Sequence, residues 1–411
     1  MSATSVLHAF TGYGIEFEYM IVDRQTLSVM PVADELMRWA AGACVAKMQR
    51  GKLGWSSELA LHLIEIKNTI PDPALEPLPA AFQAEVRYIN QQLEPLGARL
   101  MPTAMHPWMD PCTETRLWPH ADAVIYQTYD RIFGCKAHGW ANLQSMQLNL
   151  PFAGDAEFSR LHAAIRLVLP IIPALAASSP IAEGKPAGFM DFRMESYRTH
   201  QAKIPSTIAQ VIPDTVTSRA EYQAIVLAQM YRDVAPFDPD GVLRHEWLNV
   251  RGASPRFNRK AIEIRVIDVQ ECPQADLAIA AAITAVVRAI YDAEWPPLSM
   301  QQSFGTEALV NVLHACIRDA EQAVIEDARY LRLLGFPGRL CKVGELWRHL
   351  VEATSLGNSE YWHEPLRVML EHGPLARRIL RAVGPECARE RLQEVYRELC
   401  DCLEEGRMFL G

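Results

Sequence analysis

The sequence predicts an α+β fold with a mainly antiparallel sheet, and three observations support this. Strand-like alternation or enrichment in β-branched residues recurs in the first two-thirds of the chain. The segments between these runs lack the regular strand–helix alternation of a parallel sheet. From about residue 305 onward the pattern is helical only. The expected strands are Gly14–Val22, Leu61–Lys67, Asn142–Leu150 and Ala261–Val269.

Helical spacing of apolar residues appears between and after these strands. We expect helices over Leu78–Leu93, Asp155–Leu175 and the alanine-rich segment Asp276–Ala293. Pro296 and Pro297 must end the last of these, because proline lacks the backbone N–H that a helix needs. The Pro-rich turn suggests a mixed α/β part over about residues 1–297 and a helical part over about 298–411. A final helix near Glu386–Phe409 carries one apolar stripe, made of Leu392, Val395, Tyr396, Leu399, Cys402 and Leu403.

Composition indicates a globular protein that can bury a large core. The 411 residues are 49% hydrophobic and 22% charged, and the net charge is −9. An acidic chain does not offer the basic face that a nucleic-acid backbone needs, so we expect no nucleic-acid partner. A local arginine cluster in such a protein suits an enzyme that binds a small polyanion such as a nucleotide.

Cysteine usage and the N-terminus indicate a cytoplasmic protein. Nine cysteines are scattered without a CxxC pair, which fits neither a disulfide framework nor a zinc site. Met1–Phe10 shows no signal peptide. No run of about 18 apolar residues lacks both charge and proline, so we expect no membrane span.

The first candidate for chemistry is the pair Glu16 and Glu18. Side chains alternate in a strand, so both carboxylates share one face while Ile15, Phe17 and Tyr19 share the other. Two carboxylates about 7 Å apart repel each other unless a cation lies between them. Magnesium fits, because it prefers carboxylate oxygens and bridges phosphates. A solvated strand face would show the same alternation.

A second strand repeats this arrangement far along the chain. Glu263, Arg265 and Ile267 are expected on one face, opposite Ile262, Ile264 and Val266. The functional interpretation is a metal ligand beside a phosphate-binding arginine. The alternative is a lateral ion pair on an exposed strand, which stabilises by roughly 0–1 kcal/mol.

Three further groups of residues complete the candidates. Ser145, Gln147 and Asn149 form a row of neutral polar side chains that suggests either a pocket lining or a solvated face. Glu65 lies within an apolar run, where a carboxylate is costly without a partner or a metal. Glu58 would lie on the opposite face of one straight strand, so the two carboxylates converge only if the segment begins as a turn or helix. Arginine binds phosphate and carboxylate in a bidentate fork, although most arginines lie on surfaces. The arginine candidates are Arg193, Arg198 and Arg251.

Together these segments resemble glutamate-cysteine ligase family 2, a class of carboxylate-amine ligases. The resemblance rests on the strand Gly14–Tyr19, on Glu58 with Ile64–Ile66, on Ala177–Pro180 with Gly188 and Arg193, on Arg251, and on Ile262–Val266. It extends to Glu371–Arg378 in the helical tail and so covers nearly the whole chain.

The resemblance implies one catalytic domain over residues 1–411, with a glutamine-synthetase-like sheet that forms a funnel for magnesium (or manganese) and ATP. It implies that Arg265 contacts ATP phosphates and that Arg193 and Arg251 help bind substrate or phosphate. The implied product is a γ-glutamyl-type amide of cysteine or another amine, as in glutathione biosynthesis. The implied partners are small molecules, with a homo-oligomer as an option. The implied metal ligands are Glu16, Glu18, Glu58, Glu65 and Glu263.

One departure from the family pattern lies in the row of neutral polar residues, at Gln147 and Asn149. Related enzymes often carry histidine at the position of Gln147, and sometimes at that of Asn149. An amide ligates a metal only through a weaker oxygen. This departure favours one alternative, a non-catalytic sensor that binds nucleotide or glutamate. A guanidino kinase on the same fold is a second alternative. We read His62, His106, His120 and His138 as structural or surface residues.

Overall fold

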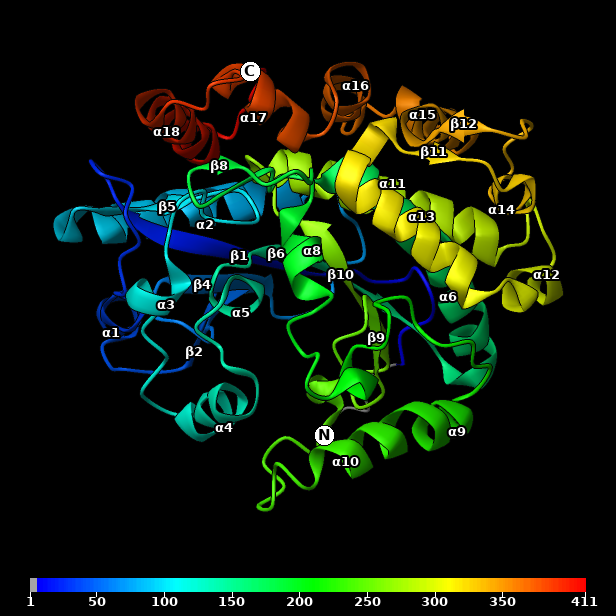
Figure 1. Ribbon diagram of the computed structural model, residues 1–411, viewed down its shortest axis with the longest axis horizontal. Coiled ribbons are helices and arrows are strands. Elements are labelled where there is room, and N and C mark those ends of the chain that lie inside the picture. Colours follow the sequence, from blue (N-terminus) through cyan, green and yellow to red (C-terminus); the bar gives the residue numbers. More distant parts are fainter. Residues whose placement is uncertain (1–5) are drawn as a thin grey trace.

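A computed structural model, described here for residues 6–411, contains one eight-stranded sheet in which every pairing is antiparallel. The strand order is β2-β3-β4-β1-β6-β10-β9, and β5 pairs with the far end of β1 (Figure 1). The antiparallel α+β prediction is confirmed. The strands are β1 (Gly14–Asp23), β2 (Lys47–Arg50), β3 (Leu53–Ser57), β4 (Leu63–Asn68), β5 (Ala98–Met101), β6 (Ser145–Pro151), β9 (Ala253–Arg256) and β10 (Ala261–Asp268).

The central strand β1 separates an apolar face from an acidic face, as its alternation predicts. Ile15, Phe17 and Tyr19 are fully buried. The ring of Phe17 lies 4.5 Å from that of Phe82 in helix α2 (Leu78–Leu93), centroid to centroid. The helices that bury this face share one hydrophobic core with the sheet. Glu16 and Glu18 therefore emerge on the opposite side.

The helical layer on the apolar face contains α2, α6 (Gly154–Val168) and α11 (Pro273–Tyr291) (Figure 1). Helix α11 alone among the described helices is long and apolar enough to cross a membrane by length and composition. The sequence predicts this helix over Asp276–Ala293 but not as a membrane span, because Asp276 and Arg288 interrupt its apolar run. Since 78% of the relevant window is buried within the protein, α11 has the surroundings of a core helix.

Shorter helices lie on the other side of the sheet. Figure 1 shows α4 (Ala123–Phe133), α5 (His138–Ala141) and α10 (Ala228–Val234) on the side of the sheet away from α2 and α11. The remaining elements of the mixed part are α1 (Ala33–Ala41), α3 (Pro111–Glu114), α7 (Pro173–Ala176), α8 (Phe192–Tyr197), α9 (Arg219–Tyr222) and the strand pair β7 (Ile181–Ala182) with β8 (Lys185–Pro186).

The C-terminal part is largely helical, but the expectation of helices only was wrong. A two-stranded sheet, β11 (Val324–Ile325) with β12 (Cys341–Lys342), interrupts it. Two residues per strand leave no periodicity for sequence reasoning to detect. The apolar stripe of α18 is buried, as expected. The helices are α12 (Leu298–Ser303), α13 (Thr306–Asp319), α14 (Ala328–Leu333), α15 (Val343–Ala353), α16 (His363–His372), α17 (Leu375–Val383) and α18 (Arg389–Glu405).

Strand β10 contains a register shift that the sequence did not reveal. Ile264 pairs with Leu148 of β6, but the next pair is Ile267 with Met146. Three steps on β10 thus match two on β6, which is a β-bulge. The expectation that Ile267 shares the face of Glu263 was wrong, because the bulge turns Ile267 into the hydrophobic core. Asp268 pairs with Ser145 instead and joins the polar side.

Candidate active site

Two neighbouring strands bring three carboxylates together on the acidic face of the sheet. Glu18 of β1 lies directly opposite Glu65 of β4, and Glu16 lies opposite Lys67. Because each strand alternates, all four side chains project from the same side. Glu16 and Glu65 are buried. The sheet register alone therefore concentrates negative charge at its centre.

Glu58 reaches this cluster through a reversal of the chain. It follows the last residue of β3, and residues 59–62 turn the chain back into β4. The turn that the sequence argument required is present. Glu18, Glu58 and Glu65 each offer a carboxylate oxygen within 4.8 Å of the other two. Such a set of oxygens fits Mg²⁺ or Mn²⁺.

The ionisation of the carboxylates shows how strongly they repel one another. Burial, followed by the charges of Glu65 and Glu263, raises the pKa of Glu16 to about 8. Burial and the neighbouring carboxylates also raise the pKa of Glu18 and, further, that of Glu58. Burial acts in the same direction on Glu65, but the charge of Lys67 and hydrogen bonds from Glu16, Lys67 and Ser56 together lower the pKa of that carboxyl. A divalent cation would relieve this repulsion.

Lys67 and Arg256 are cations of the site that the sequence analysis missed. The ammonium of Lys67 bonds to Glu65 and lies 3.8 Å from Glu16. Arg256 of β9 donates two hydrogen bonds to Glu263, of 2.7 and 3.1 Å. The spacing of Glu65 and Lys67, two residues apart, was the available signal for the first. For Arg256 the available signal was the short turn that separates Ala253–Arg256 from the strand Ala261–Asp268.

The polar row of β6 holds the carboxylates of β1 in place. The backbone N–H and the hydroxyl of Ser145 donate to Glu18, at 2.7 and 3.0 Å. Gln147 Nε2 donates to Glu18 at 2.9 Å, and Asn149 Nδ2 donates to Glu16 at 3.0 Å. Gln147, which departs from the expected family pattern, thus acts here as a hydrogen-bond donor to Glu18.

Glu263 differs from the other four glutamates because two guanidinium groups surround it. Arg256 binds it in a bidentate pair, and Arg265 Nη1 lies 3.4 Å from its Oε1. Although burial raises it, these arginines hold the pKa of Glu263 at about 2. Glu263 lies outside the set of three close carboxylates. Its role as a metal ligand stays a prediction.

A cavity of about 190 Å³ opens beside the carboxylate cluster. Glu18 and Glu58 lie on its wall together with Arg193 and Arg265. Arg193 Nε donates to Asp268, and its Nη2 has no hydrogen-bond partner among the described residues. Carboxylates and two guanidinium groups therefore meet across one small space. Aromatic side chains that the sequence analysis did not single out complete the wall: Tyr126, Tyr129, Trp140, Tyr197, His200 and Trp247.

The structure does not bring the two other arginines to this cavity. Arg251 pairs with Asp214 at 2.7 Å and donates to the carbonyl of Ser206. Arg198 pairs with Glu195 three residues earlier. Neither arginine is among the residues that line the cavity.

The four histidines that we read as structural make local contacts. His62 contacts the carbonyl of Ala141, and His106 that of Leu27. His120 bonds to Asp34, and His138 to Asn142. None of the four lines the cavity beside the carboxylates.

The raised pKa of Glu16 predicts a pH-dependent stability for the metal-free protein. Between about pH 5 and pH 8 the folded state holds a proton on Glu16 that the unfolded state has lost. The free energy of unfolding should therefore fall with rising pH, by up to about 1.4 kcal/mol per unit for this group. The measurement is thermal unfolding of the wild type and Glu16→Gln across this range in EDTA.

The comparison with Glu16→Gln cancels the contributions of the buried histidines, which titrate in this range only in the unfolded state because burial lowers their pKa in the folded one. We expect the variant to gain stability relative to the wild type as the pH rises. Magnesium should reduce this gain, because the bound cation replaces the proton. A difference between the two proteins that does not change with pH would contradict a raised pKa of Glu16.

Known proteins resemble the chain over most of its length. An uncharacterized protein of Archaeoglobus fulgidus is 33% identical over 404 residues, which cover 97% of this chain and all of that protein. A protein of a Bradyrhizobium species named "Putative glutamate--cysteine ligase 2" is 23% identical over 292 residues, or 68% of this chain and 62% of its own length.

The fold matches that of a solved ligase. The crystal structure of a glutamate-cysteine ligase from Francisella tularensis in complex with AMP superposes with a TM-score of 0.60 at 11% identity, covering 96% of this chain and 91% of that one. The family model described as glutamate-cysteine ligase family 2 matches residues 13–398, which include every strand of the sheet and all the carboxylates described above. The chain therefore belongs to glutamate-cysteine ligase family 2, whose fold is that of the ATP-dependent carboxylate-amine ligases.

Proposed function

We propose that this protein uses ATP to join a glutamate-like acid to an amine, which is cysteine or another amine, as a γ-glutamyl-type amide. The observation that supports this most directly is the cavity whose wall holds two of the three clustered carboxylates, Glu18 and Glu58, together with two guanidinium groups. ATP and a carboxylate substrate are both anions. A site that brings them together needs cations and fixed hydrogen-bond donors.

The residues present fit a magnesium site, with Glu18, Glu58 and Glu65 as the proposed ligands. Bound magnesium would neutralise charge on the phosphates of ATP. Ser145 and Gln147 donate hydrogen bonds to the carboxylate of Glu18. Such support fixes the orientation of a ligand carboxylate. Glu16 and Glu263 are proposed to bind metal in the adjoining part of the funnel.

The proposed reaction has two steps. The acid's carboxylate oxygen attacks the γ-phosphorus of ATP, the bond to the bridging oxygen breaks, and ADP leaves. The amine then attacks the carbonyl carbon of the acyl phosphate. An amide forms, phosphate departs, and the amine loses a proton to solvent. Every atom in the products derives from ATP, the acid and the amine, so no nucleophile of the protein is required.

In this proposal the two arginines position the anions. Arg265 lies between Glu263 and the cavity and would stabilise charge on the transferring phosphoryl group. Arg193 is held by Asp268, which leaves its unpartnered Nη2 for a substrate carboxylate or phosphate. The aromatic wall would cover the acyl phosphate against water.

A substrate screen tests the proposed function. The full-length protein is incubated with ATP, magnesium, glutamate and one amine at a time, with cysteine and apolar amines in the panel. We expect release of ADP that depends on the amine, and a product whose mass equals the two substrates less water. The matched control omits the amine.

Two outcomes would contradict the proposal. A phosphorylated product without an amide would favour a guanidino kinase. A thermal shift with ATP and magnesium, without turnover on any acid and amine of the panel, would favour a sensor.

A further inference from the structure

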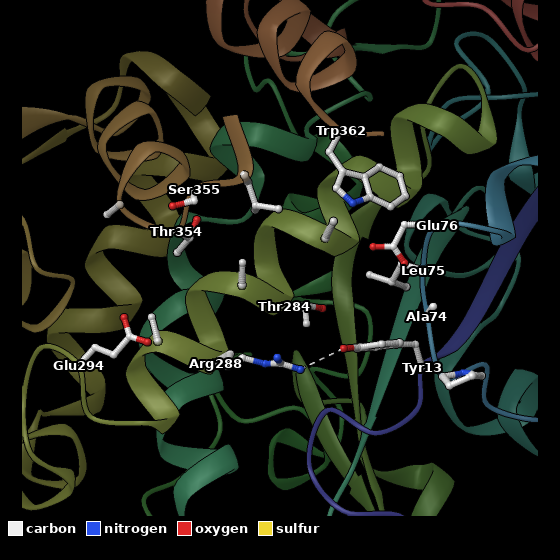
Figure 2. Close-up of a pocket in the computed structure, with 16 residues that line it drawn as sticks. Tyr13, Ala74, Leu75, Glu76, Thr284, Arg288, Glu294, Thr354, Ser355 and Trp362 are labelled. Atoms are coloured by element: carbon white, nitrogen blue, oxygen red, sulfur yellow. Dashed lines mark hydrogen bonds between the residues drawn. The ribbon is translucent and has the colours of Figure 1, made fainter. Parts of the chain in front are cut away.

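A second cavity lies in the helical layer, away from the carboxylate cluster. Its volume is about 490 Å³, and it shares no lining residue with the cavity of the candidate active site. Figure 2 shows side chains from several distant segments around it. Tyr13 precedes β1, residues 73–76 precede α2, Thr284 and Arg288 lie on α11, and residues 353–356 and Trp362 come from the helical part.

Small side chains of α11 create this space. Ala281, Ala285 and Ala289 lie four residues apart on one face of the helix and line the cavity. Thr284, on the same side, is 6% exposed, and its hydroxyl has no hydrogen-bond partner among the described residues. An unpaired buried hydroxyl is costly, so this hydroxyl is available to a polar group of a bound molecule or to water.

The charges around the cavity select the kind of molecule. Arg288 is the cation, and no described carboxylate lies within ion-pair distance of it. Two long hydrogen bonds of 3.4 Å, to the hydroxyl of Tyr13 and the carbonyl of Phe10, engage only its Nη2. Glu76 and Glu294 lie at opposite sides of the cavity in Figure 2.

One guanidinium and two carboxylates give the lining a net charge of −1. A polyphosphate would be repelled by such a lining. A zwitterion would find a partner for each of its charges: Arg288 for a carboxylate, and a glutamate for an ammonium. The alanine face of α11 and the buried ring of Trp362 offer apolar surface for the rest of the molecule.

We propose that this cavity is a second binding site, for a zwitterionic small molecule of the amino-acid class. The molecule places its carboxylate on Arg288, its ammonium near Glu76 or Glu294, and its side chain between the alanines of α11 and Trp362. Free amino acids and short γ-glutamyl amides share this chemistry.

The cavity connects to the acidic face through one short segment. The carbonyl of Tyr13 accepts a hydrogen bond of 2.8 Å from Asn68, whose Oδ1 in turn accepts one of 2.7 Å from the N–H of Ile15. Asn68 follows Lys67, the cation beside Glu16 and Glu65. A molecule bound against Tyr13 thus contacts the residue directly before the strand that carries Glu16 and Glu18.

Ligand-observed NMR with the full-length protein tests the proposal. The probes are the twenty common L-amino acids and, in a separate arm, γ-glutamylglycine and γ-glutamylcysteine. Arg265→Ala serves as background, because it weakens binding at the candidate active site. We expect at least one probe to bind this background. Its affinity should fall about tenfold when Arg288→Met removes the charge-assisted hydrogen bonds.

Further variants separate this cavity from other surfaces. Ala285→Leu fills the space against α11 and should weaken the same probe, as should Thr284→Val. Arg38→Met removes an exposed arginine of α1 outside the cavity and should leave binding unchanged. The proposal is overturned if no probe binds the Arg265→Ala protein, or if Arg288→Met and Arg38→Met bind every probe equally well.

Discussion

Replacement of Arg265 by alanine is expected to reduce amine-dependent ADP release by about 10³-fold, while the protein stays folded. The loss follows from the position of the guanidinium, which faces the cavity beside the carboxylate cluster. An arginine that stabilises a transferring phosphoryl group contributes on this scale. The measurement is steady-state ADP release with the acid and amine found in the screen.

The fold should tolerate this change because Glu263 keeps its bidentate pair with Arg256. The backbone of residue 265 also keeps its hydrogen bonds to Gly252 and from Arg193. Glu263→Gln is expected to reduce activity as well. It should also lower the unfolding temperature, because it leaves Arg256 buried without its counter-ion.

Arg259→Ala is the matched control for Arg265→Ala. Arg259 is exposed in the turn between β9 and β10 and does not line the cavity. Its loss should leave turnover within twofold or so, since surface changes of this kind have small effects. Turnover of Arg265→Ala within tenfold of the wild type would contradict the proposed role of Arg265.

The largest expected effect on stability comes from Arg378 of α17. Its side chain is fully buried and pairs with the equally buried Glu271 at 2.5 Å. It also donates to the carbonyl of Phe409, whose own N–H donates to Glu271 at 3.2 Å. Arg378→Met should lower the free energy of unfolding by about 3–5 kcal/mol, because it leaves the carboxylate of Glu271 buried and uncompensated. Urea unfolding followed by circular dichroism measures the change.

A double variant and a control show whether the unpaired charge is the cause. Arg378→Met with Glu271→Gln should be more stable than Arg378→Met alone, because no ionised group is then left unpaired. Arg381→Met changes an exposed arginine one turn further along the same helix and should cost less than about 1 kcal/mol. Equal losses for Arg378→Met and Arg381→Met would show that the buried pair does not hold the C-terminal segment.

Long, regular elements could be predicted from the sequence, and short ones could not. The helix Leu78–Leu93 has the expected bounds, and β1 ends one residue later than expected. The strands β2, β5 and β9 have four residues each and β3 has five, too few for alternation to be distinguished from chance. These strands are nevertheless important, because β3 delivers Glu58 and β9 delivers Arg256.

The candidate site could be anticipated in its residue types more than in its pairings. Alternation placed Glu16 and Glu18 on one face without knowledge of their neighbours. That Lys67 lies opposite Glu16 depends on the register of β1 with β4, which no local pattern encodes. The aromatic wall comes from helices distant in sequence, so only the tertiary structure brings Tyr126 and Trp247 to the same cavity.

The bulge in β10 makes the number of residues in this strand as important as their identity. Asp268 lies five positions after Glu263, so without the bulge regular alternation would put Asp268 on the opposite face. With it, Asp268 lies where it can hold Arg193 beside the cavity. A deletion of one residue in this segment would remove the bulge and still leave both carboxylates on one face, whereas an insertion of one residue would turn Asp268 to the opposite face. Alignments of relatives should accordingly show no insertion of a single residue in this segment.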